Sequence, residues 1–229
     1  MIGFFGNFIA AHPWRWAMGL AIILCIFPSV DIWFSGLFFD SETQKWVQRS
    51  NIMQFLRSGV PPLVIGTVIF YLLLWGAGYF LNFVMWNANS RNVGFLLVSL
   101  ALGPGLLVES ILKTQLGRPR PRDTTVFGGQ ESFVAALWPM GSCERNCSFV
   151  SGHAALAFWA TAFAFLFPSP YRLPVILAGL ILGLIMGLAR IAEGAHFLSD
   201  IVFAGIFVVG LNVWLVQRMR LPEKTNDED

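Results

Sequence analysis

Residues 173–189 read LPVILAGLILGLIMGLA, a stretch that contains no charged side chain. A helix that crosses a bilayer takes roughly 20 consecutive, mostly apolar residues, and this stretch comes close to that length. The rest of the chain has the same character, since 56% of its 229 residues are hydrophobic and only 12% are charged. The composition therefore indicates a membrane protein.

Five further apolar stretches surround residues 173–189 in the sequence. The six predicted membrane spans are Trp16–Phe34, Val60–Val84, Val93–Leu112, His153–Phe167, Leu173–Ala189 and Phe197–Val216. The fourth is short for a full span, and we expect it to borrow residues 148–151 or to tilt against its neighbours. We predict an all-α fold, a six-helix transmembrane bundle with a polar loop between the third and fourth spans. Residues 1–229 are predicted to form a single integral-membrane domain, with a disordered charged tail at 221–229.

The charge and cysteine content exclude some partners and cofactors. The formal net charge is only +2, so the chain lacks the electrostatic footprint of a nucleic-acid-binding protein. No Cys/His cluster has zinc spacing and no carboxylate cluster suits Mg²⁺ or Ca²⁺, so neither a metal nor another cofactor is expected. Cys143 and Cys147 lie four positions apart in the longest polar loop. They would stay thiols in a reducing compartment and could form a small disulfide outside the cytoplasm, and the sequence leaves both states open.

Three short polar stretches concentrate the ionisable residues. Directly after residues 173–189 comes RIAEGAHFLSD (Arg190–Asp200), which bridges the fifth and sixth predicted spans. KTQLGRPRP (Lys113–Pro121) follows the third span, and SFVSGH (Ser148–His153) precedes the fourth. Because successive spans alternate in direction, all these ends lie on one face of the membrane. The three stretches are therefore predicted to converge on one site.

Two of the stretches suit the binding of a phosphate group. Lys113 ends a helix, and the prolines and glycine that follow stop that helix and stiffen the chain that presents Arg120. Arginine binds phosphate oxygens through two nitrogens, whereas lysine acts as a point charge. Ser151 and Gly152 stand just before a helix, where the hydroxyl can cap the helix and unpaired backbone N–H groups can point at an anion. We predict a phosphate cradle at this position.

The remaining residues suit catalysis. His196 and Asp200 are four positions apart, which places them on one face of a helix. The carboxylate can accept a hydrogen bond from one ring nitrogen and leave the other nitrogen nucleophilic. We therefore expect His196 to attack phosphorus and Asp200 to orient the ring. His153, at the mouth of the cradle, can protonate the departing oxygen as a general acid.

Other charged residues have simpler interpretations. Glu109 lies one helical turn before Lys113 and is expected to be its ion-pair partner. Glu193 is interpreted as a solvated loop charge. For Arg118 and Arg122, contact with a substrate headgroup and a place on the loop surface are equally compatible with the sequence.

The three stretches resemble the signatures of the type 2 phosphatidic acid phosphatase family, K-x6-R-P, P-S-G-H and S-R-x5-H-x3-D. The matching residues are Lys113, Arg120 and Pro121, then Ser151, Gly152 and His153, then Arg190, His196 and Asp200. The resemblance covers residues 60–216 and implies a six-helix fold, a phosphohistidine intermediate at His196 and an acid at His153. It also implies phosphate binding by Lys113, Arg120, Ser151, Gly152 and Arg190. Val150 and Ala189 replace the proline and the serine of the pattern, and neither position must move a proton or form a bond.

The resemblance implies a metal-independent lipid phosphate phosphatase that hydrolyses a phosphomonoester or a pyrophosphate. Candidate substrates are lipid A, phosphatidylglycerophosphate, phosphatidic acid and polyprenyl pyrophosphate. The pair Cys143 and Cys147 is similar to that of bacterial members that act on lipid A or related envelope lipids. Two alternatives stay open: a lipid phosphotransferase that uses the same site, and a non-catalytic protein that binds or transports lipid headgroups.

The expected partners are a phosphorylated membrane lipid and the lipid bilayer, and the sequence does not indicate an oligomeric state. We expect a multi-pass protein of the cytoplasmic (inner) membrane. Six spans put both termini on one side, expected to be the cytoplasm. The active site then faces the periplasm or the cell exterior.

Overall fold

The computed structural model describes residues 13–47, 50–83, 85, 87–139 and 141–221. Within these ranges the chain is mostly helical, with one two-stranded antiparallel hairpin. Most of the predicted tail 221–229 lies outside the described residues, which end at Leu221. The elements are α2 (Pro13–Ile26), α3 (Ser29–Gly36), β1 (Phe39–Asp40), β2 (Lys45–Trp46), α4 (Asn51–Ser58), α5 (Val60–Leu81), α6 (Ser90–Leu100), a π-helix (Ala101–Leu112), α7 (Lys113–Gln115), two 3₁₀ turns (Pro121–Asp123 and Thr125–Phe127), α8 (Gly152–Trp159) with a 3₁₀ extension (Ala160–Leu166), α9 (Ser169–Ala192) and α10 (Leu198–Arg218).

Four helical segments are long and apolar enough to cross a membrane. They are Asn51–Leu81, Ser90–Gln115, Pro170–Ala192 and Leu198–Arg218. At ~1.5 Å rise per residue, even the shortest of them matches the ~30 Å hydrocarbon core of a bilayer. The bent pair α2 and α3 brings the count to five, and the segment Gly152–Leu166 is a shorter apolar helix. The count of six spans stays a prediction.

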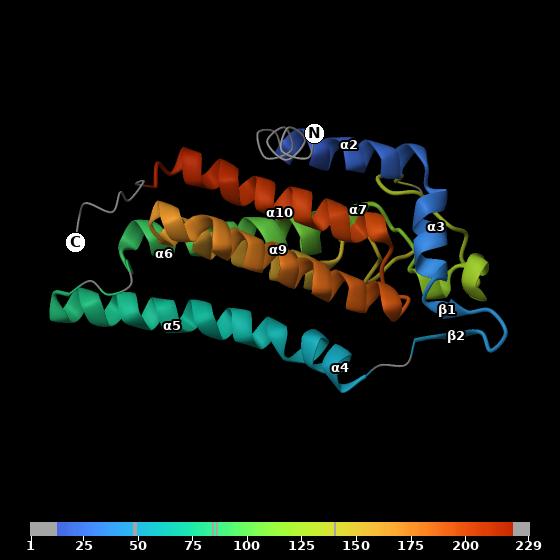
Figure 1. The fold of residues 1–229 in the computed structure, drawn as a ribbon, viewed down its shortest axis with the longest axis horizontal. Helices are drawn as coiled ribbons and strands as arrows, with labels where there is room; N and C mark the ends of the chain where they lie inside the picture. The colour runs from blue at the N-terminus through green and yellow to red at the C-terminus, as the bar shows by residue number, and fades with distance from the viewer. Residues whose placement is uncertain (1–12, 48–49, 84, 86, 140, 222–229) are drawn as a thin grey trace, which may run out of the picture.

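The first predicted span, Trp16–Phe34, is divided into two helices. Helix α2 ends at Ile26, α3 begins at Ser29, and the two axes meet at 92°. Pro28 lies at the break, where its missing N–H and its ring prevent the helical hydrogen bonds from continuing. The bend turns α3 across the end of the bundle, where its residues Asp31 and Ser35 are buried (Figure 1).

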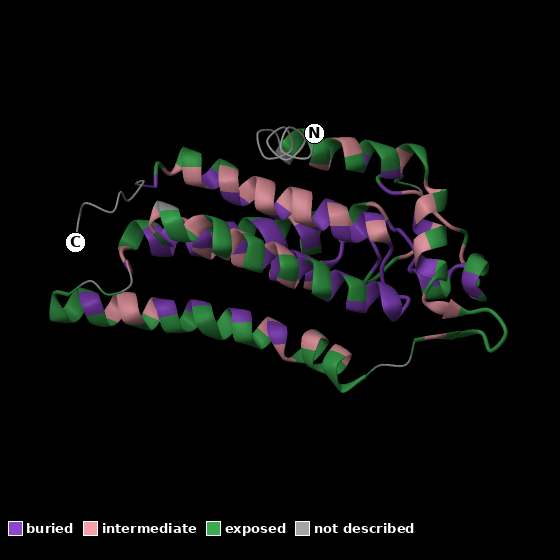
Figure 2. Ribbon diagram, viewed as in Figure 1, coloured by how far each residue is buried: buried purple, intermediate pink, exposed green. Residues whose placement is uncertain are grey.

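The core forms where α8 packs against its neighbours, chiefly α9 and α10. Glycines at every fourth position of α9 permit this close approach, which is a common feature of membrane helix pairs. A Cβ atom at Gly179, Gly183 or Gly187 would overlap atoms of Thr161, Phe158 and Ile201, respectively. Burial is accordingly concentrated in the middle of the bundle, whereas α5 is largely exposed (Figure 2).

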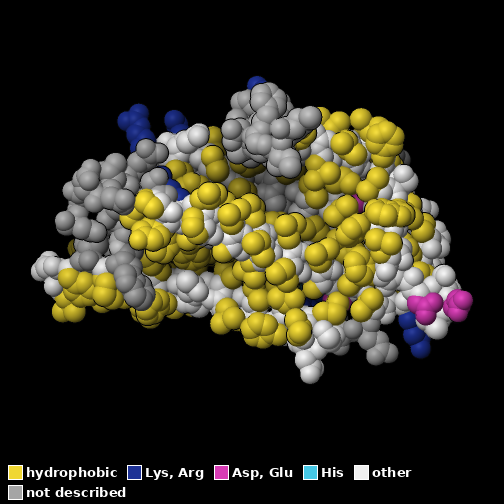
Figure 3. All heavy atoms as spheres, in the orientation of Figure 1, with side chains coloured by type: hydrophobic (Ala, Val, Ile, Leu, Met, Phe, Trp, Pro, Cys, Tyr) yellow, Lys and Arg dark blue, Asp and Glu magenta, His cyan; other side chains and the backbone are white. Residues whose placement is uncertain are grey.

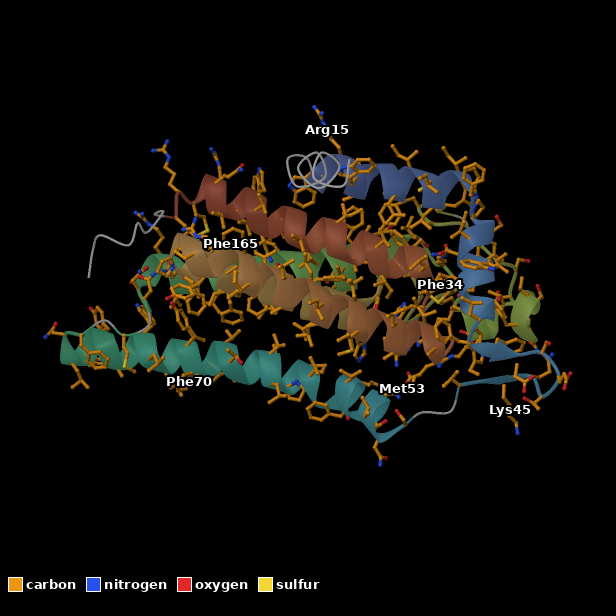
Figure 4. The ribbon with its side chains drawn as sticks, in the orientation of Figure 1. Arg15, Phe34, Lys45, Met53, Phe70 and Phe165 are labelled. Atoms are coloured by element: carbon orange, nitrogen blue, oxygen red, sulfur yellow. A yellow bond between two sulfur atoms is a disulfide. The ribbon has the colours of Figure 1, made fainter. Side chains whose placement is uncertain are left out.

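The outer surface is largely apolar. Hydrophobic side chains cover most of the face seen in Figure 3, including large exposed residues of α2, α5 and α9. Such extended apolar surface is expected where helices face lipid. In Figure 4, Phe70 points outward from α5, whereas Lys45 of the hairpin lies beyond the helix ends. The end of the molecule that carries Lys45 is also the end at which α9 finishes and α10 begins (Figure 1).

Candidate active site

The structure brings the three polar stretches together at this end of the bundle. Backbone hydrogen bonds join them directly: the Ser148 N–H donates to the Arg118 carbonyl at 2.7 Å, and the Ser151 N–H donates to the Asp200 carbonyl at 3.3 Å. The Arg122 N–H donates to the Gly194 carbonyl at 3.1 Å. Segments from the loop after α7, the loop before α8 and the α9–α10 turn thus form one structural unit.

His196 is a fully enclosed ring in the α9–α10 turn, with 1% of its surface exposed. Its Nδ1 atom lies 2.8 Å from the Ser148 carbonyl oxygen and 3.5 Å from Asp200 Oδ2. A carbonyl oxygen can only accept, so Nδ1 carries the proton and Nε2 keeps a free lone pair. The direct partner of His196 is therefore a backbone carbonyl that the sequence did not indicate, and Asp200 stands just beyond hydrogen-bond distance.

Burial lowers the pKa of His196 below its usual value, because a charged imidazolium would lose its hydration. The neighbouring Asp200 carboxylate acts in the opposite direction without cancelling the effect. Arg190 and Arg120 add a further repulsion against a second positive charge. The ring is therefore held in the neutral form that a nucleophile requires.

Asp200 lies in the first turn of α10 and is completely buried. Its Oδ2 atom accepts from the Ser148 hydroxyl at 2.5 Å and from the Phe197 N–H at 2.8 Å. Its Oδ1 atom accepts from Arg118 Nη1 at 2.5 Å. A carboxylate at this position also interacts favourably with the helix dipole. Asp200 thereby ties the loop residue Ser148, whose carbonyl holds His196, to the start of α10.

Arg118 contradicts both interpretations that the sequence left open. Only 1% of its surface is exposed, so it does not lie on the loop surface, and each of its guanidinium nitrogens donates to the chain and not to a headgroup. Instead its guanidinium lies between Asp200 and Asp31, and Nη2 donates to Asp31 Oδ2 at 2.7 Å. Burial alone would lower the pKa of Arg118, but the two carboxylates raise it above its ordinary value. Arg122, by contrast, is an exposed loop residue.

The residues of the predicted phosphate cradle lie at the start of α8. The Ser151 hydroxyl caps the helix by accepting from the Ala154 N–H at 3.4 Å. A Cβ atom at Gly152 would overlap the Glu109 carboxylate and would lie 3.0 Å from Lys113 Nζ, so the end of the π-helix faces the start of α8 at very close range. His153 follows at the second position of the helix and is partly buried. A helix N-terminus with a facing ammonium is a suitable anion site.

Each predicted phosphate-binding cation is held by an acceptor of the chain. Lys113 Nζ lies 2.6 Å from Glu109 Oε1, which confirms the predicted ion pair. Arg120 Nε donates to the Asn146 carbonyl at 2.9 Å, and its Nη2 donates to Asn146 Oδ1 at 2.6 Å. Burial, and then the nearby Arg122, lower the pKa of Arg120. These contacts hold the side chains of Lys113 and Arg120 in fixed positions.

Arg190 pairs with Glu193, which corrects the interpretation of Glu193 as a solvated charge. Glu193 is only 8% exposed, because the turn at Gly194 (φ +65°) folds the chain back and the Trp46 ring packs directly against that glycine. The buried Nε atom of Arg190 finds no acceptor among the residues that the structure describes. Buried donors are nearly always hydrogen-bonded, so a water molecule or a ligand atom can supply the acceptor that this atom lacks.

A disulfide between Cys143 and Cys147 closes the loop just before Ser148, with the two Cα atoms 5.7 Å apart. The Cys143 N–H donates to the Gly117 carbonyl at 2.9 Å, which fixes this loop against the segment that precedes Arg118. Within the described ranges, no group of three or more His, Cys, Asp or Glu side chains is arranged to hold a metal ion.

The chain is similar to several known proteins. The model of the PAP2 superfamily matches residues 92–222. A lipid A 4'-phosphatase of Francisella tularensis subsp. novicida (strain U112) is 32% identical over 207 residues, which cover 89% of this chain and 91% of that protein. Proteins of the same name are 33% identical in Rhizobium etli (86% of this chain, 81% of that protein) and in Rhizobium leguminosarum (82% and 86%). No solved structure matches the chain significantly.

These matches confirm the family resemblance of the three polar stretches, and they extend it over most of the chain. The protein belongs to the PAP2 superfamily and is a phosphomonoester hydrolase.

Proposed function

We propose that this protein is a multi-pass lipid phosphatase of the inner membrane that removes a phosphate from lipid A through a phosphohistidine at His196, without a metal. Three relatives with the name lipid A 4'-phosphatase support the substrate class. The observation that carries the catalytic part is the arrangement of His196, whose Nδ1 donates to a carbonyl and whose Nε2 remains free.

The reaction proceeds in two displacements. In the first, neutral His196 attacks phosphorus through Nε2, the bond between phosphorus and the lipid oxygen breaks, and His153, which starts as the imidazolium, donates a proton to that oxygen. In the second, His153 takes a proton from water, the resulting hydroxide attacks the phosphohistidine, and the N–P bond breaks. The products are the dephosphorylated lipid and inorganic phosphate, and both histidines return to their starting states.

The phosphoryl oxygens are stabilised by Lys113, Arg120 and Arg190, together with the hydroxyl of Ser151 and the N–H of Gly152. The unpaired Arg190 Nε supports this assignment, because a phosphate oxygen would supply the acceptor that it lacks. The charge that develops in the transition state then meets fixed cations in a site with little water, where such interactions are strongest.

The disulfide supports an active site that faces the periplasm. Cys143 and Cys147 lie in the same loop as Ser148, so the two sulfurs and the catalytic groups share one side of the membrane. Disulfides persist in oxidising compartments such as the periplasm and are rare in the cytoplasm.

Purified protein in detergent should release inorganic phosphate from lipid A, and His196→Ala should release none while it inserts and purifies normally. Near-normal turnover by His196→Ala would exclude this mechanism. The wild type should form an acid-labile, alkali-stable phosphoprotein that His196→Ala does not form. Activity should survive EDTA, and loss of activity that added metal restores would contradict the metal-free site.

The same assay distinguishes the alternative functions. A panel of lipid A, phosphatidylglycerophosphate, phosphatidic acid and polyprenyl pyrophosphate measures selectivity through kcat/KM, and we expect lipid A to rank first. Labelled phosphate that appears on a second lipid would indicate a phosphotransferase. Headgroup binding without phosphate release would indicate a binding or transport protein.

A further inference from the structure

We propose that Arg118 and Asp31 form a buried clamp that positions the proposed catalytic group, and that the N-terminal segment therefore completes the active site. This inference rests on the proposed function, since it assigns a role in that reaction to two residues that do not touch the substrate. Arg118 bridges Asp31 and Asp200, Asp200 holds the Ser148 hydroxyl, and the Ser148 carbonyl holds His196.

Arg118 is bonded on every side of its guanidinium. Nε donates to the Val134 carbonyl at 2.8 Å, and Nη1 donates to the Ser199 hydroxyl at 2.8 Å as well as to Asp200. The planar group also lies over the Phe197 ring, with its central carbon 4.3 Å from the ring centroid. Because every guanidinium nitrogen already donates to an acceptor of the chain, the effect of Arg118 on the reaction passes through Asp200.

Asp31 anchors the other end of the clamp. Its Oδ1 accepts from the Ser199 N–H at 2.8 Å, and its Oδ2 accepts from the Ser199 hydroxyl at 2.5 Å and from Arg118 at 2.7 Å. The carboxylate is completely buried, and a buried charge is tolerated only where it is paired and hydrogen-bonded. The match to the PAP2 superfamily begins at residue 92, so Asp31 adds a contact from outside the family region.

The charges of the clamp come from three elements, and Asp200 is the one that acts directly on His196. Asp31 belongs to α3, Arg118 to the loop after α7, and Asp200 to α10, so the buried group contains two carboxylates and one guanidinium. Arg120 and Arg190 face the ring with positive charge, and His153 of α8 also interacts with it. Removing one clamp charge therefore changes the electrostatic potential at His196 in a known direction, whereas a purely structural contact would change only the amount of folded protein.

The test compares phosphate release by full-length variants over a range of pH. Arg118→Gln leaves Asp200 less compensated, which favours protonation of His196, so the acid limb of kcat/KM should move to higher pH. Asp31→Asn removes a negative charge, so the limb should move to lower pH. Arg118→Lys keeps the positive charge but loses the two guanidinium arms that reach both Asp31 and Asp200. The acid limb of kcat/KM should therefore stay in place, while kcat falls by about 10- to 100-fold with little change in KM.

Arg91→Lys is the matched control, because Arg91 is an exposed residue whose side chain donates to the Arg220 carbonyl at the opposite end of the bundle. It should leave kcat, KM and the pH profile unchanged. The double variant Asp31→Asn/Arg118→Lys should be no slower than Arg118→Lys alone if Asp31 acts through Arg118. All rates are normalised to the amount of phosphohistidine trapped, so that misfolded protein does not count.

Unchanged kcat in Arg118→Lys, a raised KM with unchanged kcat, or additive effects in the double variant would overturn the clamp. If Arg118→Lys does not fold, Ser199→Ala serves as the second variant, since it removes the hydroxyl between Asp31 and Arg118 and should lower kcat several-fold. An active His196→Ala would refute the proposed function instead. An active wild type, an inactive His196→Ala and unaltered clamp variants would refute this inference alone.

Discussion

The Nδ1 atom of His196 lies 2.8 Å from the backbone carbonyl oxygen of Ser148. This contact fixes the tautomer of the ring and its rotation, and both are needed for Nε2 to face a phosphorus atom. Because the acceptor belongs to the backbone, the orientation of His196, the proposed nucleophile, depends on the path of the loop and not on one side chain. Two contacts fix the path of this loop. The Asp200 carboxylate accepts a hydrogen bond from the Ser148 hydroxyl, and the Cys143–Cys147 disulfide closes the loop directly before Ser148.

The pH dependence should reflect the burial of His196. Burial lowers the pKa of His196, so the neutral nucleophile persists below the usual histidine value of about 6.5. The decline of kcat/KM that comes from protonation of His196 should therefore begin only below a pH of about 6.5. A pH–rate profile of the purified enzyme measures this, and an acid limb centred above the usual value would contradict it.

Ser148→Ala should slow the reaction without removing the carbonyl that holds His196. The variant loses the hydroxyl that donates to Asp200 at 2.5 Å. A hydrogen bond to a charged group contributes about 1.5–3 kcal/mol, so we expect kcat to fall by roughly tenfold or more. Ser58→Ala on the exposed helix α4 is the control and should behave as wild type. Equal kcat for the two variants would show that Asp200 does not need this bond.

Gly152→Ala should weaken substrate binding while the fold remains intact. The added methyl group would overlap the Glu109 carboxylate and crowd Lys113 Nζ, and both are ends of flexible side chains that can move away. We expect KM to rise with little loss of thermal stability, since Ala is favoured over Gly in a helix by up to ~1 kcal/mol. Gly76→Ala in α5, where nothing lies within 4 Å, is the control. An unchanged KM would place the phosphate elsewhere.

Reduction of the disulfide should destabilise the loop that precedes Ser148. Opening so short a loop costs about 2 kcal/mol in the chain-entropy account, so dithiothreitol should lower the melting temperature of the wild type by a few degrees. The variant Cys143→Ser/Cys147→Ser should melt at that lower temperature and should not respond to dithiothreitol. Differential scanning fluorimetry in detergent measures both. Identical melting of oxidised and reduced wild type would contradict the prediction.

The sequence predicts well that the three polar stretches meet at one end of the bundle, because this depends only on their spacing along the chain and on the alternating direction of the spans. The pairing of Glu109 with Lys113 follows from helical periodicity alone. The expectation that His196 and Asp200 share one face of a helix was wrong, because α10 begins at Leu198 and His196 lies in the turn before it. The roles of the arginines do not follow, since Arg118, Arg120 and Arg122 alternate along one short segment and look alike. The fold buries the first completely and leaves the last exposed, which only the path of the chain decides.

Other structural features had only a weak signal in the sequence or none at all. The Ser148 carbonyl has no side-chain signature, so no motif could reveal its contact with His196. The Trp46 ring that packs against Gly194, the residue after Glu193, comes from a hairpin almost 150 positions earlier. Two signals were present: Pro28 marks the break in the first span, and Asp31 is a lone acid in an apolar segment, where an ionisable residue usually has a function.

The bond between the Ser199 N–H and Asp31 joins positions that are 168 residues apart. A ribosome that has released α3 must still make nearly the whole protein before Asp31 finds its partner. During that time, the nascent chain holds Lys113, Arg120 and His153 without the turn that carries His196. The buried group that Asp31 and Ser199 share can therefore be completed only after the start of the last helix, α10, has been made.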